Sequence, residues 1–238
     1  TDATQMFIKP GSDHLFGTDR FGRDLLSRVI YGVRVSLVVA FSSIGLSLGI
    51  GATLGMIAAY FGHLVDQILG RIMDIFFSLP SILLAIAISS VLGTGARNAV
   101  IAIGIVYMPT FFRVMRSSVL SEKEEVYVEA SRSIGAGSWY IMFRQILRNA
   151  LAPIYVQTAV CLSYAILLEA ALSFLGVGVQ PPTPSWGTIL NSGRSYLEMA
   201  PWISIFPGLF IMFSVLAFNF FADGMRDITD PRLSTHGR

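Results

Sequence analysis

The chain has 238 residues, of which 53% are hydrophobic and 13% are charged, and its formal net charge is +2. Soluble globular domains carry about 25% charged residues, so this composition excludes both a disordered chain and an ordinary soluble domain. A single cysteine, Cys161, excludes an internal disulfide framework. The three histidines lie far apart and have no acidic or cysteine partner at metal-ligand spacing, so we expect no metal site. The mean hydropathy of +0.65 predicts a membrane protein.

The first part of the chain, residues 1–34, is a polar flank without a secretory signal or an initiating methionine, and we expect that sequence is missing before it. Within it, the stretch from Phe21 to Arg34 places its apolar residues on one helical face. This pattern predicts an amphipathic helix that lies along the membrane surface. A solvated basic flank is the alternative.

Five stretches without formal charge follow, and each is compared with the roughly 20 apolar residues that a bilayer-spanning helix needs. They are the 31 residues between Arg34 and Asp66, the 22 between Asp74 and Arg97, the 15 between Arg97 and Arg113, the 20 between Arg148 and Glu169, and the 24 between Glu198 and Asp223. The third is short, but the long stems of its flanking arginines can reach both interfaces. The sequence therefore predicts an all-α, polytopic transmembrane helical bundle with five spans in residues 35–222.

Glycine and proline mark positions inside these spans. Gly45, Gly49, Gly51 and Gly55 follow the small-x-x-x-small spacing that favours close helix packing. Prolines occur in or beside four spans, at Pro80, Pro109, Pro153 and Pro207. Each removes a backbone donor and favours a kink, which serves either to line a cavity or simply to pack.

Orientation follows from the basic residues on alternating sides of the spans. Ten lie on the side that holds the loop 113–148 and the tail 223–238, and seven lie on the side that holds residues 1–34. We therefore expect the loop and the C-terminal tail to be cytoplasmic and the N-terminal flank to be extracytoplasmic.

Several kinds of chemistry have no support in the sequence. The only two lysines, Lys9 and Lys123, lie outside any phosphate-binding loop, so we expect no ATP site in this chain. No set of nucleophile, base and metal ligands suggests an enzyme. Glu169 is the one ionisable residue in the middle of a span, which makes it a candidate intramembrane polar site. Either a hydrogen bond between helices or a proton-coupled role would explain it.

The 113–148 loop is too long and too patterned for a simple connector. A short helical stretch from Val126 to Ile134 precedes Gly135 and Gly137, which can end the helix by adopting left-handed dihedral angles. The pattern predicts a protruding helix with apolar contacts. A docking element and a solvated amphipathic loop are both consistent with it.

Several motifs in this chain resemble one family. Glu129-Ala130-Ser131-x-x-x-Gly135 is similar to the E-A-A-x-x-x-G cytoplasmic loop of the membrane subunits of bacterial-type ABC importers. Three further stretches resemble the dipeptide, oligopeptide and nickel permease group. They are Gly17-Thr18-Asp19-x-x-Gly22-Arg23-Asp24-x-x-Ser27-Arg28, Ser173-Phe174-Leu175-Gly176-Val177-Gly178 continuing to Trp186-Gly187, and Ala217-Phe218-Asn219 running to Asp230-Pro231. The chain departs from the pattern at Ser131, where the family has alanine. It departs again over Gln145 to Asn149, where the family has His-x-Leu-Pro-Asn, and at Ala222, where glycine is usual.

The resemblance implies a permease subunit in the cell inner membrane, with a sixth, N-terminal span missing from this chain. The expected partners are a homologous permease subunit, two ATP-binding-cassette ATPase subunits and an extracytoplasmic substrate-binding protein, with no nucleic acid. ATP and magnesium would be bound by the ATPase subunits, which would couple to this chain through Glu129, Ala130, Ser131 and Gly135. Di- or oligopeptides are the expected cargo. Nickel or another small solute is the alternative within the family, and a stand-alone secondary transporter is the alternative outside it.

The outer segment from Val179 to Pro201 contains several prolines together with Trp186 and Tyr196, the aromatic types favoured at a bilayer interface. The prolines are expected to prevent a regular helix. The segment is read either as a stiff interfacial connector or as a gate or docking rim for the binding protein. On the second reading, bulky charged substitutions at Ser185 or Gly187 would reduce transport without disturbing assembly.

Overall fold

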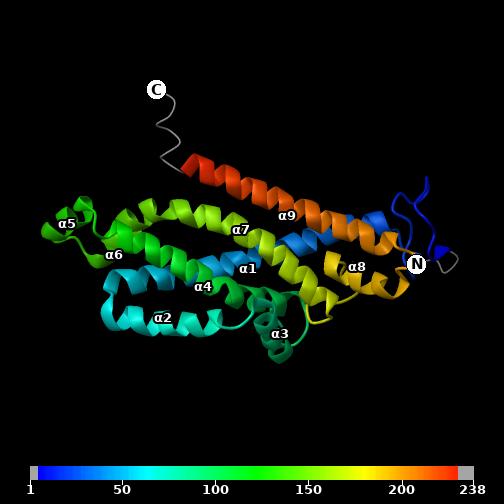
Figure 1. Cartoon of the computed structure of the whole chain (residues 1–238), viewed down its shortest axis with the longest axis horizontal. Helices are drawn as coiled ribbons and strands as arrows, with labels where there is room; N and C mark the ends of the chain where they lie inside the picture. Colours follow the sequence, from blue (N-terminus) through cyan, green and yellow to red (C-terminus); the bar gives the residue numbers. More distant parts are fainter. Residues whose placement is uncertain (1–4, 230–238) are drawn as a thin grey trace, which may run out of the picture. The chain divides into compact units, whose positions relative to one another are not determined.

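The computed structural model describes residues 5–229, whose regular elements are helices (Figure 1). The four long helices are α1 (Leu25–Phe61), α4 (Ala96–Glu122), α7 (Leu147–Phe174) and α9 (Trp202–Thr229). The shorter ones are α2 (His63–Phe77), α3 (Ser81–Leu92), α5 (Val126–Ser133), α6 (Ser138–Tyr140) and α8 (Trp186–Gly193), with a π-helical stretch at Ile141–Ile146 and a 3₁₀ turn at Arg194–Tyr196. The expected all-α class is confirmed.

The expected spans correspond closely to these helices, with one exception. Within the described residues, four helices are long and apolar enough to cross a membrane, and a fifth span is reached if α2 and α3 are counted as one. These two helices meet at an angle of 94°. Pro80 explains the break, because proline lacks the backbone donor and disfavours a helical conformation at Leu79 before it. The charge-free stretch after Asp74 therefore contains a corner instead of one straight span.

Some boundaries differ from those expected. The amphipathic stretch in residues 21–34 forms no separate surface helix, because from Leu25 onward it is the first part of the continuous helix α1. In the 113–148 loop, α4 continues to Glu122, α5 covers Val126–Ser133 and helical structure begins again at Ser138, so little of the loop is irregular. The C-terminal tail begins as helix, since α9 continues to Thr229. Residues 230–238, the rest of that expected tail, lie outside the described residues.

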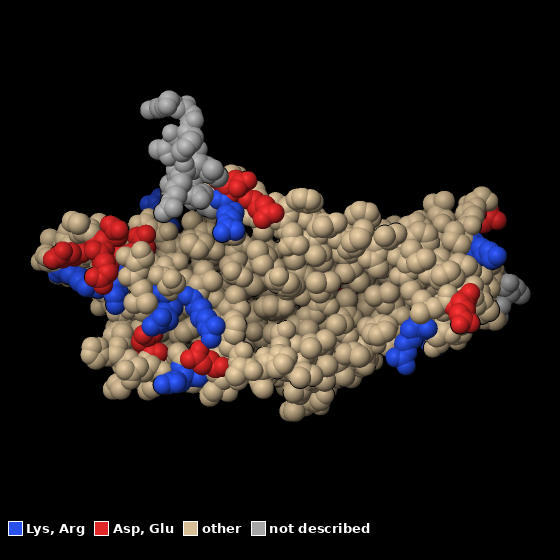
Figure 2. Space-filling view, in the orientation of Figure 1, with Lys and Arg blue, Asp and Glu red and all other residues tan. Residues whose placement is uncertain are grey.

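The described chain folds as two compact units, each built from separated stretches of sequence. Unit 1 comprises residues 5–43, Ile82–Ile103 and Leu162–Ala217; unit 2 comprises Ile44–Ser81, Gly104–Cys161 and residues 218–229. The long helices supply residues to both units. On the face shown in Figure 2, the charged side chains of unit 2 gather toward the end that carries α5, and the helix surface next to them is nearly uncharged. This segregation is the pattern that a membrane imposes.

The contact of α1 with α4 in unit 2 depends on small residues. Gly51 and Gly55 are buried against the backbone carbonyl groups of Met108 and Phe112, where a Cβ atom would collide with the carbonyl oxygen. Gly45 and Gly49 have nothing within 4 Å of the position that a Cβ would occupy. Packing against α4 therefore explains only the last two of the four spaced glycines.

The core of unit 1 is centred on Trp186 at the start of α8. This side chain is fully buried; its indole N–H donates to the backbone carbonyl of Val29 at 3.2 Å, and its backbone N–H donates to Ser36 Oγ at 3.3 Å. Both acceptors belong to α1. The tryptophan therefore holds α8 against α1, and its full burial corrects the prediction of an aromatic ring exposed at the bilayer interface.

Candidate functional site

Helix α5 is held on unit 2 by one face. Val128 is fully buried in the apolar core that also contains Met115 and Ile146. Burial of a valine side chain contributes about 1.5 kcal/mol or more. On the same face, the Tyr127 hydroxyl donates to Glu122 Oε2 at 2.7 Å, and burial together with this carboxylate raises the pKa of the tyrosine. The short helix is therefore anchored on the core of unit 2.

Ser131 and Gln145, two positions where the chain departs from the family pattern, contact each other. Ser131 is buried, and its hydroxyl donates to the Tyr127 backbone carbonyl at 2.9 Å. The same oxygen accepts from Gln145 Nε2 at 2.8 Å. Gln145 lies in the π-helical stretch before α7, so this contact ties α5 to the following helix. The two departures are therefore joined by a hydrogen bond.

The opposite face of α5 is exposed. Glu129 and Ala130, both expected in the coupling segment, lie on this face. Large apolar side chains are also exposed at the two ends of α5 and in α6: Val126 is 78% exposed, Ile134 86% and Trp139 61%.

Gly135 sets the turn that ends α5. Its φ of +83° lies in the left-handed region, as the sequence predicted. Its N–H donates to the Arg132 carbonyl at 3.0 Å, and the next N–H, of Ala136, donates to the Ser131 carbonyl at 3.0 Å. Gly137 has an ordinary φ of −68°, so only the first of the two glycines needs its conformational freedom. Of the four expected coupling residues, Glu129 and Ala130 are exposed, Ser131 is buried, and Gly135 forms the turn that ends the helix.

Two ion pairs join α2 to α4 in unit 2, and sequence reasoning missed the partners. Arg116 binds Asp66 through two hydrogen bonds of 2.5 Å each, and Arg113 binds Asp74 at 2.9 Å. The Arg113 guanidinium also lies 3.7 Å from the centroid of the Phe77 ring. Asp74 lies 39 positions before Arg113, and Asp66 lies 50 positions before Arg116. Because the partners are so far apart in the sequence, only the fold reveals the pairing.

Glu169 is buried in α7, and its neighbours are polar. Its exposed fraction is 0%, and its Oε1 accepts from the Ser173 hydroxyl at 2.8 Å. Ser173 Oγ in turn accepts from the Val179 backbone N–H at 3.0 Å. Glu169 Oε2 has no hydrogen-bond partner in the described part of the chain. The carboxyl group thus supports the turn after its own helix, and the hydroxyl groups of Ser36 on α1 and Ser185 before α8 also lie close to it.

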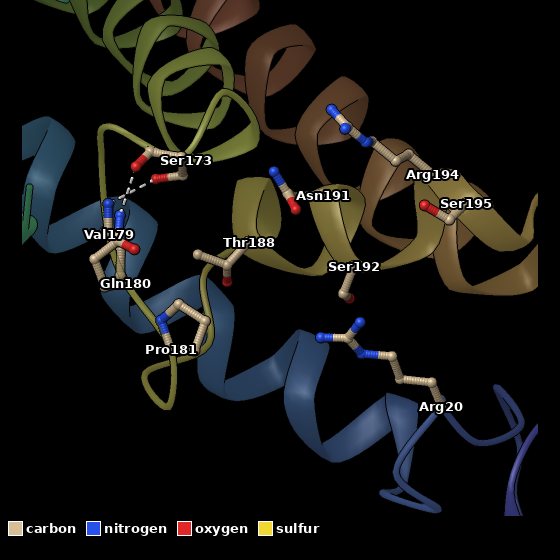
Figure 3. A pocket seen from close by; sticks show the side chains of 11 residues that line it. Arg20, Ser173, Val179, Gln180, Pro181, Thr188, Asn191, Ser192, Arg194 and Ser195 are labelled. Atoms are coloured by element: carbon tan, nitrogen blue, oxygen red, sulfur yellow. Dashed lines mark hydrogen bonds between the residues drawn. The ribbon is translucent and has the colours of Figure 1, made fainter.

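A polar cavity of about 330 Å³ lies next to this turn in unit 1, and we call it the outer cavity (Figure 3). Its lining comprises Arg20, Ser173, Gly176, Val179, Gln180, Pro181, Thr188, Asn191, Ser192, Arg194 and Ser195. Helix α8 supplies much of this lining. Ser185 caps α8 by accepting from the Thr188 N–H at 3.3 Å, and the Thr188 hydroxyl accepts from the Ser185 N–H at 2.8 Å. The segment expected to lack helix therefore contains one, because three of its four prolines lie before this capping box and the fourth, Pro201, lies after α8.

The packing of Ser185 and Gly187 changes what a bulky charged substitution at either position would test. Both residues are buried. A Cβ on Gly187 would collide with the backbone carbonyl of Ala170 and lie 2.7 Å from Ser173 Cβ. A bulky charged residue at either position would disturb the folding of unit 1, so it does not probe docking.

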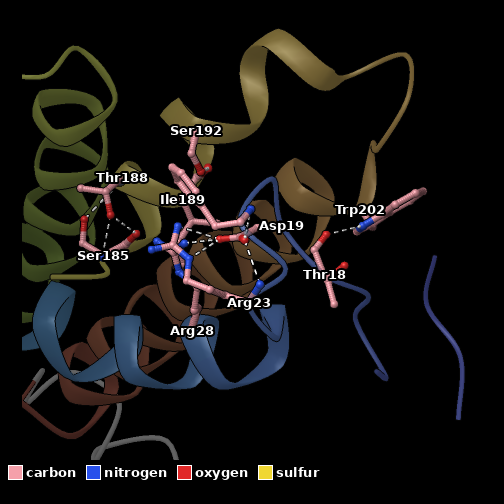
Figure 4. A network of polar contacts seen from close by, with 10 residues as sticks. Thr18, Asp19, Arg23, Arg28, Ser185, Thr188, Ile189, Ser192 and Trp202 are labelled. Carbon is pink, nitrogen blue, oxygen red and sulfur yellow. Dashed lines mark hydrogen bonds and ion pairs between the residues drawn. The ribbon is translucent and has the colours of Figure 1, made fainter. Parts of the chain in front are cut away.

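The motif before α1 is a compact polar network around Asp19 (Figure 4). The Asp19 side chain accepts from the backbone N–H groups of Phe21 and Arg23 at 2.8 and 3.0 Å, and from Arg23 Nε at 2.7 Å. Arg28 binds the same carboxylate. Burial alone would raise the pKa of Asp19, but the backbone donors and the two guanidinium groups outweigh burial and lower it.

Other residues of this motif also have defined structural roles. Gly17 has a φ of +76°, and a Cβ there would lie 2.5 Å from the Ile8 carbonyl oxygen. The Trp202 indole N–H donates to the Thr18 carbonyl at 3.3 Å, which fastens the flank to α9. Asp24 accepts from the Ser27 N–H at 2.8 Å at the start of α1. The N-terminal motif is therefore an ordered structural element of unit 1.

Comparison with known proteins agrees with this description. The family of binding-protein-dependent transport system inner membrane components matches residues 51–235. The chain is 47% identical over 235 residues to the dipeptide transport system permease protein DppC of Alkalihalophilus pseudofirmus, covering 99% of this chain and 77% of that protein. It is 50% identical over 219 residues to the di/tripeptide transport system permease protein DppC of Pseudomonas aeruginosa, covering 92% and 72%.

A further relative is the glutathione transport system permease protein GsiD of Pectobacterium atrosepticum, 43% identical over 226 residues, covering 95% of this chain and 75% of that protein. Among solved structures, an inward-facing MetNI methionine ABC transporter matches with a TM-score of 0.70 at 19% identity, covering 87% of this chain and 98% of that one, which shows a shared fold. The chain is therefore a multi-pass inner-membrane permease subunit of an ABC importer and not an enzyme, and it belongs to the family of binding-protein-dependent transport system inner membrane components.

Proposed function

We propose that this permease subunit imports di- or oligopeptides. The support is the set of relatives at 43–50% identity, whose names specify dipeptide, di/tripeptide and glutathione transport. Glutathione is itself a short peptide, so all three names describe one class of cargo. A homologous permease subunit would complete the path through the membrane.

The exposed face of α5 is proposed as the coupling surface for an ATPase subunit. The observation that carries this proposal is the division of α5 into a face anchored by Val128 and Ser131 and a face that leaves Glu129 and Ala130 exposed. A short helix fixed on one side can transmit the motion of a partner bound to its other side. On this proposal, two ATPase subunits bind ATP and magnesium, α5 is cytoplasmic, and the opposite side faces the substrate-binding protein.

Reconstitution tests the proposed cargo. The chain is purified with its partner permease, ATPases and binding protein, and ATP-dependent uptake of a labelled dipeptide, a tripeptide, glutathione and nickel is measured in proteoliposomes. We expect peptide uptake that requires ATP and the binding protein. Uptake of nickel without peptide uptake would favour the family alternative. Uptake by this chain alone, driven by a proton gradient, would contradict the proposal in favour of a secondary transporter.

A further inference from the structure

A second cavity, of about 390 Å³, lies between α2 and α4 in unit 2, and we call it the α2 pocket. Its lining includes three arginines and two aspartates: Arg71, Arg113, Arg116, Asp66 and Asp74. Figure 2 shows basic and acidic side chains close together over this part of unit 2. The five charged side chains leave the pocket with one surplus positive charge.

Arg71 carries this surplus charge. Asp66 is already bound by Arg116 through two hydrogen bonds, and Asp74 is bound by Arg113. Arg71, by contrast, is exposed and forms no ion pair within the part of the chain that the structure describes. A guanidinium presents five N–H donors in a planar fork that matches the oxygens of a phosphate group. The pocket therefore offers an arginine that is available to an anionic ligand.

Arg113 is held in position but keeps donors of its own. Its hydrogen bond to Asp74 joins side chains that are 47% and 61% exposed, and exposed ion pairs of this kind are weak. Its guanidinium lies 3.7 Å from the centroid of the Phe77 ring, a contact that orients the group and leaves its charge in place. Arg113 can therefore contribute to anion binding beside Arg71.

Gly70 leaves room for a ligand in the wall of the pocket. It lies in the middle of α2, and nothing lies within 4 Å of the position that its Cβ would occupy. The contact of α2 with α4 uses another residue, because Met73 is buried in a cluster with Phe112. The open space at Gly70 is therefore not needed to pack the two helices together.

An exposed apolar face of α2 borders the pocket. Ile68, Ile72 and Ile75 are 58%, 41% and 65% exposed, and their spacing places them on one side of the helix. Arg71 lies three residues after Ile68 and four before Ile75, so it stands at the edge of this face. A basic group beside an apolar helix face suits a ligand with an anionic head and apolar tails.

We propose that the α2 pocket binds the head group of an anionic glycerophospholipid. Arg71 and Arg113 bind the phosphate, and the isoleucine face of α2 contacts the acyl chains. Basic pockets between membrane helices on the cytoplasmic side are the kind of site that takes such head groups. The inference goes beyond the proposed function and shares with it only the orientation in which α5 is cytoplasmic, since Arg113 and Arg116 lie on the side of the 113–148 loop.

The test titrates the complete importer in detergent with phosphatidylglycerol or phosphatidylcholine, and native mass spectrometry counts the bound lipid. Arg71→Glu reverses the free charge, Arg71→Lys keeps it, and Gly70→Leu fills the pocket without changing its charge. Arg148→Glu is the matched charge control, because Arg148 is an exposed arginine of unit 2 that does not line the pocket. Gly45→Leu is the control for bulk, since its Cβ position is equally open. Size exclusion checks that each complex is intact.

We expect the native complex to bind phosphatidylglycerol about tenfold more tightly than phosphatidylcholine, and Arg71→Glu and Gly70→Leu each to raise the Kd for phosphatidylglycerol about tenfold. Arg71→Lys and the two controls should stay within about threefold of the native complex. Native-like affinity of Arg71→Glu for phosphatidylglycerol would overturn the inference. So would displacement of the lipid by an equal concentration of inorganic phosphate, because the site would then take a soluble anion.

Loss of the second permease subunit from the Arg71→Glu complex would also contradict the inference, because the pocket would then belong to the contact between permeases. The titration contains no ATP, peptide or binding protein, so a failure to bind lipid would leave the proposed cargo standing. A native complex that binds the lipid but does not import peptides would refute the proposed cargo alone.

Discussion

Two buried polar residues of this permease, Ser131 and Asp19, have well-defined hydrogen-bond partners. Ser131 sits between the Tyr127 carbonyl and the Gln145 amide, and Asp19 collects two backbone donors and two guanidinium groups. When a buried polar group loses its hydrogen-bond partner, the protein loses more stability than the hydrogen bond itself contributed, because the group stays buried and cannot bond to water instead. Substitutions at these positions therefore have measurable and separable consequences.

Ser131→Ala should destabilise the protein by about 1–2 kcal/mol, because it leaves the Gln145 Nε2 donor without an acceptor. Thermal unfolding of the purified complex measures the loss. Ser133→Ala is the matched control, since Ser133 lies in the same helix, is exposed, and its hydroxyl donates to the Glu129 carbonyl at 3.0 Å. In a double-mutant cycle with Gln145→Leu, the two effects should be non-additive by at least about 0.5 kcal/mol. Additive effects would show that the two residues do not act as a pair.

Asp19→Asn should lower the unfolding midpoint at neutral pH and lose this effect in acid. The folded-state pKa of Asp19 is depressed below its ordinary value of 3.8, so its contribution is present above that value and disappears as the pH falls through the folded pKa. The difference in midpoint between native protein and variant should therefore be largest near pH 7 and shrink below about pH 4. Asp13→Asn is the control, because Asp13 is exposed and its carboxylate accepts a 3.3 Å hydrogen bond from the hydroxyl of the neighbouring Ser12. A difference that is constant with pH would contradict the assignment.

The helices show where sequence patterns suffice and where they do not. Four long apolar segments became four long helices, because hydropathy and length determine a span. The corner between α2 and α3 could not be predicted from the length of the uncharged stretch, because that length does not indicate that Pro80 breaks the helix. Helix α8 was not predicted for a different reason: the prolines of the segment disfavour a helix only where they stand, and none of them lies between the Ser185 cap and the end of α8.

The glycines of α1 give a test at this scale. Gly51→Ala should destabilise the protein by about 1–3 kcal/mol, because the new methyl group collides with the Met108 carbonyl. Gly49→Ala, two residues away, should be neutral or slightly stabilising, since its Cβ position is open within the described residues and alanine favours a helix. Unfolding of the two variants in detergent compares them directly. Equal losses would mean that the spacing of small residues, and not this backbone contact, determines the packing.

For the whole molecule, the sequence predicted the helical class and the short helix that became α5, and resemblance supplied the transporter family and the coupling role that we propose for this helix. The outer cavity and the α2–α4 ion pairs could not be predicted, because their residues come from distant parts of the chain. Arg20, for example, meets residues of α8 that lie more than 160 positions later. Such juxtapositions follow from packing and have no local signature.

Coupling through α5 is the central claim, and Gly135→Val tests it most directly. Valine is strained at the φ of +83° by about 1–3 kcal/mol, which should displace the end of α5 while the buried face stays anchored. Gly137→Val is the matched control, because Gly137 is also exposed and open but has an ordinary φ of −68°. The measurement is ATP hydrolysed per peptide imported in proteoliposomes, together with recovery of the ATPase subunits on purification. The account predicts that Gly135→Val lowers import about tenfold and weakens ATPase recovery, while Gly137→Val stays within about twofold of native. Native-like import and ATPase recovery for Gly135→Val would contradict it.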